Sequence, residues 1–126
     1  MTIGRSMNVV LGMLLIAFVT VPRVATAQKL SDAEFKKLGA SATTAAEHKK
    51  LAAHYRAHAA EHEADAKMHE EIVASAKKDV SSGHAFELAI GAAHYAEHSH
   101  EAAEALRELA DLHEGMAEAA GKGKGK

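Results

Sequence analysis

The chain has no cysteine and no tryptophan, and its 126 residues include a single proline. Without cysteine it can form no disulfide, no thiolate metal site and no thiol nucleophile. Because the one proline is Pro22, no proline interrupts a helix anywhere after it. Aromatic residues make up only 4% of the chain, and its formal net charge is −2. This charge does not fit a nucleic-acid-binding protein, and so few bulky side chains predict a thin core.

Long hydrophobic runs are also scarce, and the one that exists lies near the start. It covers residues 9–21, which is shorter than the ~20 residues of a membrane-spanning helix. Arg5 precedes it, and Ala25-Thr26-Ala27 follows with the small-x-small pattern of a leader-peptidase site. We therefore expect residues 1–27 to be a signal peptide cleaved after Ala27. The remaining chain is then periplasmic or secreted and retains no membrane span.

Two capping boxes mark where helices begin. Ser31 and Glu34 have the spacing of the first box, and Thr44 and Glu47 have that of the second. The organisation expected from these signals is a short N-terminal helix with its linker at 28–43, a helical hairpin at 44–120 and a flexible Gly/Lys tail at 121–126. A Ser-Ser-Gly turn at 81–83 divides the hairpin.

The predicted fold class is all-α, with two long antiparallel helices forming a helical hairpin. Pairing about the turn places residues whose numbers add to about 165 at the same height. A two-helix hairpin buries little surface, so we expect two hairpins to pair into a four-helix bundle as a homo-oligomer.

A heptad-type seam is predicted on each long helix. On the first helix it contains His48, Leu51, Tyr55, His58, His62, Asp65, His69, Ile72 and Ala76. On the second it contains Leu88, Gly91, Tyr95, His98, Ala102, Ala105, Leu109, Leu112 and Met116. Histidine thus occupies positions where a soluble helix normally carries leucine.

The chain has ten histidines, all between His48 and His113, and many repeat at helical intervals. Side chains three and four apart share a helix face, so two such imidazoles can chelate one ion while the facing helix supplies more ligands. Nitrogen and oxygen donors without thiolate fit Zn²⁺, Cu²⁺ or Ni²⁺, and fit Cu(I) poorly. The predicted metal ligands are His58, His62, Asp65, His69, His94, His98 and Glu101.

Strings of the type His-x-x-Glu-His occur at 58–62 and 94–98 and match those of inverted zinc peptidases. Such enzymes need a further ligand and a substrate cleft in a much larger fold, so we give these strings no catalytic meaning. Glu97 and His100 have the spacing of carboxylate di-iron bundles, but they lie on the polar side of their helix. The chain also lacks a nucleophile with an adjacent base and a phosphate-binding loop. We therefore expect that this protein is not an enzyme.

The segment HKKLAAHYRAHAAEHEADAKMHEEI, at 48–72, is followed by a second helix with a His-Tyr pair. This pattern resembles small, uncharacterised exported His/Ala-rich helical hairpin proteins of environmental bacteria. The resemblance implies a helical hairpin and export, and it carries over no activity.

The sequence predicts an exported histidine-rich protein that binds transition metal ions for buffering, sequestration or delivery. Two alternatives remain open. The first is an acid-responsive periplasmic stress protein or chaperone, because imidazole changes its charge between pH 5 and 8. The second is a structural helical hairpin with no ligand.

Overall fold

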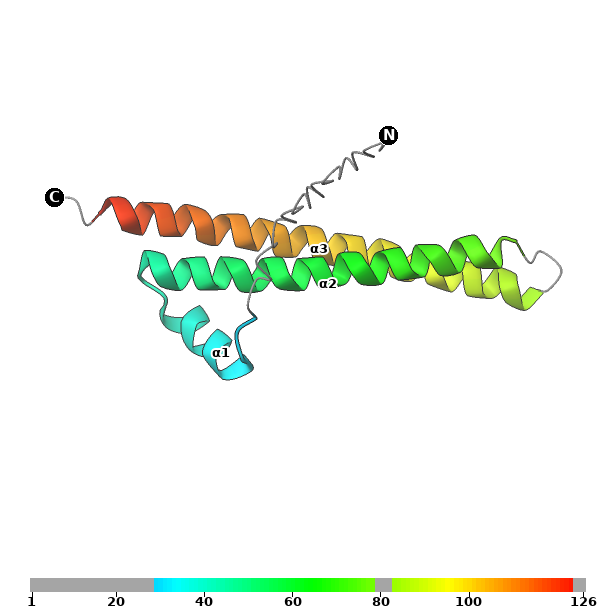
Figure 1. Ribbon diagram of the computed structural model, residues 1–126, viewed down its shortest axis with the longest axis horizontal. Coiled ribbons are helices and arrows are strands. Elements are labelled where there is room, and N and C mark those ends of the chain that lie inside the picture. Colours follow the sequence, from blue (N-terminus) through cyan, green and yellow to red (C-terminus); the bar gives the residue numbers. More distant parts are fainter. Residues whose placement is uncertain (1–28, 79–82, 124–126) are drawn as a thin grey trace, which may run out of the picture.

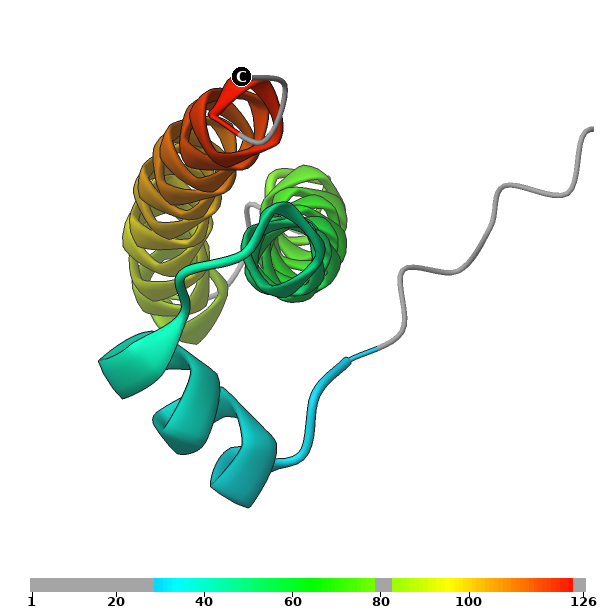
Figure 2. The same ribbon diagram turned by 90° about the vertical axis from the view of Figure 1, so that its left-hand side faces the viewer.

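The computed structural model describes residues 29–78 and 83–123, and in these ranges it contains three helices and no strand. Helix α1 spans Asp32–Ser41, α2 spans Ala45–Ala76 and α3 spans Gly83–Lys122. The two long helices lie side by side along their length (Figure 1). Viewed along their axes, α1 lies below them and is linked directly to the start of α2 (Figure 2).

Both predicted capping boxes are present and explain where α1 and α2 begin. The Ser31 hydroxyl accepts a hydrogen bond from the Glu34 N–H, and the Glu34 carboxylate accepts one from the Ser31 N–H in return. Thr44 and Glu47 repeat this arrangement at α2. Hydrogen bonds from the Thr43 and Thr44 backbones lower the pKa of Glu47 to about 2. At the starts of α1 and α2, the capping box therefore satisfies the backbone N–H groups of the cap residue and of the third helical residue.

The helix ends differ slightly from those expected. α1 continues to Ser41, two residues beyond Gly39, and α3 continues to Lys122, two residues beyond the predicted end of the hairpin. The expected signal peptide at 1–27 and the two serines of the expected turn lie outside the described residues. Among the helices that the structure describes, none is long and apolar enough to cross a membrane.

Contacts between α2 and α3 show that the two helices run in opposite directions. His48, near the start of α2, meets His113 near the end of α3. His69, near the end of α2, stacks on Tyr95 in the first half of α3. The numbers in each pair add to about 165, the value expected from the turn. The axial positions of residues on α2 relative to those on α3 therefore follow the sequence prediction.

The interface itself is built mainly from alanine, and here the predicted seam is wrong on α3. The buried positions of α3 are one residue further along than expected, so the larger side chains of the predicted seam are exposed. On α2 the predicted seam is buried or partly buried at every position except Asp65, which is exposed, and Leu51 is fully buried. Three further buried residues, Ala52, Ala59 and Ala66, each lie one position after a predicted seam residue. The seam alanines, buried on both helices, are Ala52, Ala59, Ala66, Ala92, Ala96, Ala103, Ala110 and Ala117.

Helix α1 covers the first part of α2. The ring of Phe35 stacks on His54 with 4.6 Å between ring centroids, and it meets the edge of Tyr55. The Leu30 N–H donates to Nδ1 of His54 over 3.1 Å. On this side of α2, Leu51 is 0% exposed and is the largest fully buried side chain. The short helix thus supplies the apolar cover that the alanine seam lacks.

One edge of the α2–α3 pair carries cross-helix ion pairs. Arg56 binds both Asp111 and Glu114, and Arg107 binds Glu63 with 2.8 Å between nitrogen and oxygen. The groups are largely solvent-exposed, so each ion pair contributes little to stability. Their main effect is to fix how the two helices are placed relative to one another.

Candidate functional site

Two imidazoles meet across the helices at the end of the pair where α2 begins. The Nδ1 atoms of His48 and His113 are 3.1 Å apart, and the rings are stacked with 5.3 Å between centroids. Both side chains are half-buried, and Tyr55 also stacks on the His113 ring at 5.6 Å. For the two nitrogens to share a hydrogen bond, one must donate and the other accept, so at least one ring must be neutral.

The surroundings of His113 disfavour its imidazolium form. Burial lowers the pKa of His113, and the neighbouring His48 lowers it further. A neutral imidazole is the form that coordinates metal ions, because coordination uses a nitrogen lone pair. The pair therefore presents ring nitrogens from two helices in a form suited to binding a cation.

His54 is a second imidazole held neutral, for a different structural reason. It is 6% exposed, and its Nδ1 accepts the Leu30 N–H, so the ring proton of the neutral form lies on Nε2. Burial lowers the pKa of His54, with smaller contributions from His58 and Lys29. Protonating Nδ1 would break the bond to Leu30 and place a charge beneath the Phe35 ring. His54 thus joins α1 to α2 only while it is uncharged at Nδ1.

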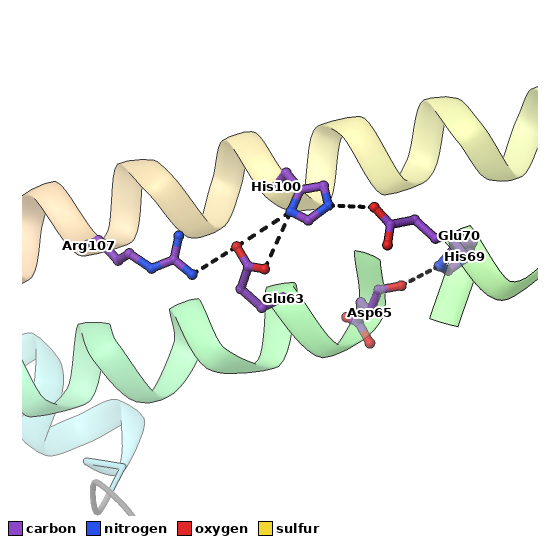
Figure 3. Close-up of polar contacts among 6 residues, drawn as sticks. All are labelled: Glu63, Asp65, His69, Glu70, His100 and Arg107. Atoms are coloured by element: carbon purple, nitrogen blue, oxygen red, sulfur yellow. Dashed lines mark hydrogen bonds and ion pairs between the residues drawn. The ribbon is translucent and has the colours of Figure 1, made fainter. Parts of the chain in front are cut away.

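His100 has the opposite preference because it lies between two carboxylates (Figure 3). Its Nε2 is 3.0 Å from Glu70 and its Nδ1 is 3.4 Å from Glu63, both of which come from α2. Both ring nitrogens donate to carboxylates only in the imidazolium form. Hydrogen bonds to Glu70 and Glu63 accordingly raise the pKa of His100. Arg107 binds the same Glu63, so the cluster includes a permanent positive charge.

The predicted ligands on α2 do not converge in the single chain. His58 lies 3.3 Å from Glu61 of its own helix, and His62 is half-buried along the interface. His69 donates a hydrogen bond through Nδ1 to the backbone oxygen of Asp65, 2.8 Å away, while its ring stacks on Tyr95. Figure 3 shows the Asp65 and His69 contact beside the His100 cluster.

The predicted ligands on α3 face outward. His94 and His98 are exposed, and Nδ1 of His98 is 3.3 Å from the carboxylate of Glu101 one turn on. Tyr95, between these histidines, is the residue that meets His69. Within residues 29–78 and 83–123, no group of three His, Asp or Glu side chains is arranged so that it could hold one metal ion. The single chain therefore forms imidazole and carboxylate pairs, and the seven predicted residues do not make one site.

Sequence reasoning passed over His48, His54, His100 and His113 as site residues. The signal for His48 and His113 was present, because the antiparallel pairing already put them within one helical turn of each other. The signal for His100 lay in the acidic residues opposite it on α2. The contact of His54 with Leu30 had no signal, since it depends on how the segment before α1 folds back.

Comparison of the chain with protein-family models, with curated proteins and with solved structures finds no match.

Proposed function

We propose that this protein is exported and binds divalent transition metal ions, with His48 and His113 as a cross-helix ligand pair. The observation that supports this most directly is the 3.1 Å distance between their Nδ1 atoms. An ion ~2.0–2.1 Å from each nitrogen would see them at an angle of about 100°. That angle suits tetrahedral Zn²⁺ and square-planar Cu²⁺ or Ni²⁺.

Two protein ligands leave the other coordination positions to water or to a second molecule. A structural metal site is normally closed by four protein ligands, and a pair of imidazoles is open by comparison. Such a site takes up and releases metal readily, which suits buffering, sequestration or delivery. The proposed site is therefore a reversible one, and we propose no catalytic role for it.

The proposal includes a finer architecture. Residues 79–82 would close α2 and α3 into a hairpin, and two hairpins would pair into a four-helix bundle. The opposite directions of the two helices favour the hairpin. Large apolar side chains that remain exposed on α3, such as Leu112 at 54%, favour the pairing.

Titration of the purified protein with Zn²⁺, Cu²⁺ and Ni²⁺ at pH 7.5, by calorimetry and thermal melting, tests the metal site. We expect saturable micromolar or tighter binding and a higher melting temperature, because a ligand of the folded state stabilises it. His48→Ala and His113→Ala should each weaken this binding at least tenfold. His84→Ala, at an exposed histidine in the first turn of α3, is the matched control. Equal metal affinities of His48→Ala and His84→Ala would contradict the assignment of His48 as a metal ligand.

A second candidate function, an acid-responsive protein, is favoured by the buried imidazoles. His54 and His113 have lowered pKa values in the folded chain. Between them they join α1 to α2 and α2 to α3. Acid would therefore loosen all three helices at one end of the molecule and expose the apolar surface that α1 covers.

The pH dependence of unfolding tests this second function. His54 and His113 bind protons more weakly when folded, so the free energy of unfolding should fall as the pH drops below ~6.5, the ordinary pKa of histidine. His100 acts with the opposite sign, since its raised pKa contributes stability at low pH that fades as the pH rises through the folded value. Urea unfolding at pH 7.5, 6.5 and 5.5 should show a shallower acid loss in His113→Gln and a steeper one in His100→Gln. An acid slope in His113→Gln equal to that of the unsubstituted protein would contradict this account.

A further inference from the structure

α3 carries a second heptad row of side chains, which lies beside the buried alanines and is exposed to solvent. We call it the α3 apolar stripe, and its residues are Leu88, Gly91, Tyr95, His98, Ala102, Ala105, Leu109, Leu112 and Met116. Leu88 is 50% exposed and Tyr95 is 55% exposed. α1 packs on α2 and does not approach the backbone of α3, so it leaves the stripe uncovered. A soluble helix with a continuous exposed apolar row is typical of a surface that another helix covers.

The spacing of large and small residues along the stripe identifies a second copy of this chain as the occupant. In an antiparallel pair with its two-fold axis midway between His98 and Ala102, the large side chains in the middle of the stripe each meet a small one. Tyr95 faces the partner's Ala105, and Leu109 faces the partner's Gly91. His98 faces the partner's Ala102. Leu88 meets the partner's Leu112 at each end, so the stripe from Leu88 to Leu112 is self-complementary, as a two-fold interface requires.

The surface beside Gly91 is hollowed in a way that suits this pairing. A groove between α2 and α3 is lined by His69, Ile72, Leu88, Gly91 and Tyr95, together with Glu87 and Ala92. Because Gly91 has no side chain and nothing lies within 4 Å of where its Cβ would be, a leucine from outside can enter at this point. The partner's Leu109 lies opposite it in the proposed register.

Charges along the edge of the stripe favour the same register. His94, Glu101 and Glu108 form the row next to the stripe, on the side away from α2. The antiparallel arrangement sets His94 beside the partner's Glu108, and symmetry repeats this contact at the other end. An imidazole opposite a carboxylate is attractive or hydrogen-bonded in either protonation state.

The two-fold axis then brings together ligands that a single chain leaves apart. His98 and Glu101 are within 3.3 Å of each other on one chain, with side chains 76% and 68% exposed. Their copies lie at axial separations of ~6 Å for His98 and ~3 Å for Glu101, from the rise of an α-helix. Two imidazoles and two carboxylates therefore surround the axis. Without a cation, the facing Glu101 carboxylates would repel each other.

We infer that two copies of this chain pair antiparallel through the α3 apolar stripe and bind one divalent transition metal ion on the two-fold axis. The ligands are His98 and Glu101 of each copy, a nitrogen and oxygen set that fits tetrahedral Zn²⁺. This inference rests on the proposed metal-binding function, because that function supplies the choice of a transition metal ion as the ligand. It adds a site that is incomplete in the single chain and depends on the partner, whereas the His48 and His113 pair needs no partner.

Sedimentation with Zn²⁺ and with a chelator tests the pairing and the on-axis ion. We expect a dimer that is at least tenfold tighter with Zn²⁺. The double variant His98→Ala, Glu101→Gln should lose that gain and one bound ion per dimer. Leu109→Glu should be monomeric in both conditions, yet still bind Zn²⁺ through His48 and His113. If the unsubstituted protein binds Zn²⁺ but stays monomeric, this inference fails and the proposed function stands. If it binds no Zn²⁺, both fail.

Cross-linking tests the register, since a chain without cysteine accepts a single new one cleanly. In the antiparallel pair, Ala102 lies ~6 Å of axial rise from its copy, and Gly115 lies ~45 Å from its own. Without added metal, a short bismaleimide should link Ala102→Cys at least tenfold more than Gly115→Cys. Equal linking of both variants indicates a parallel pair and overturns the register and the on-axis site.

Discussion

Replacing Ala66 with leucine is expected to lower the free energy of unfolding by about 1–3 kcal/mol or more. Ala66 is 0% exposed and lies between Glu63 and His69, whose contacts with His100 and Tyr95 fix its height on the pair. Near that height the buried residues of α3 are all small, namely Ala96, Ser99 and Ala103. A leucine has no hole to enter, so the two helices must separate.

Ala64→Leu is the matched control, because Ala64 is exposed on the same helix two residues earlier. It adds the same volume at a position where the side chain extends into solvent. The free energy of unfolding should therefore change by less than about 0.5 kcal/mol. Urea unfolding followed by far-UV circular dichroism at one protein concentration measures both variants. Equal midpoints for the two would mean that the alanine seam is not closely packed.

Removing the Leu51 side chain should cost about 2–5 kcal/mol, the range for leucine-to-alanine changes in a closed core. Leu51 is the largest fully buried side chain, and it lies one helical turn before His54 and Tyr55, which the Phe35 ring of α1 contacts. Its loss leaves a cavity at the junction of α1 with α2. Because few other large side chains are buried, the rest of the core has little with which to compensate.

Ile90→Ala is the control for this second change, since it removes a similar volume from a side chain that is 45% exposed. Ile90 lies on α3 outside both the alanine seam and the α3 apolar stripe, so we expect a cost below about 1 kcal/mol. Limited proteolysis adds a local readout, because Leu51→Ala should free α1 before the long helices unfold. Protection of α1 equal to that in Ile90→Ala would contradict the packing described for Leu51.

The parts of the fold that depend on short-range chemistry followed directly from the sequence. Ser31 with Glu34, and Thr44 with Glu47, predicted the starts of α1 and α2 because a capping box involves only four neighbouring residues. The heights of His48 against His113 also followed, since they depend only on the position of the turn and the rise of a helix.

The rotation of α3 about its own axis did not follow from the sequence, and it decides which residues face α2. The prediction placed Leu88, Tyr95 and Leu109 in the core because they are larger and more apolar than the alanines beside them. The structure buries the alanines, and a shift of one residue turns the helix by about 100°. That rotation carries His94 and His98 outward and His113 inward.

The choice between the two rows on α3 is tertiary information. Alanine permits a closer approach of two helices, whereas the larger row suits a partner that supplies its own large and small side chains. A sequence in which both rows have heptad spacing does not say which row meets its own chain. For the same reason, the predicted ligands formed no single site within one chain.

The alanine seam also determines which contacts fix the axial alignment of the two helices. Alanines seven residues apart are nearly interchangeable, so sliding α3 by one heptad would replace one small contact with another at little cost in packing. The contacts that differ along the length are polar or aromatic: Arg56 with Glu114, Arg107 with Glu63, and the rings of His48 and His113. Longitudinal alignment therefore resides in these side chains, and salt or acid acts on alignment before it acts on helix content.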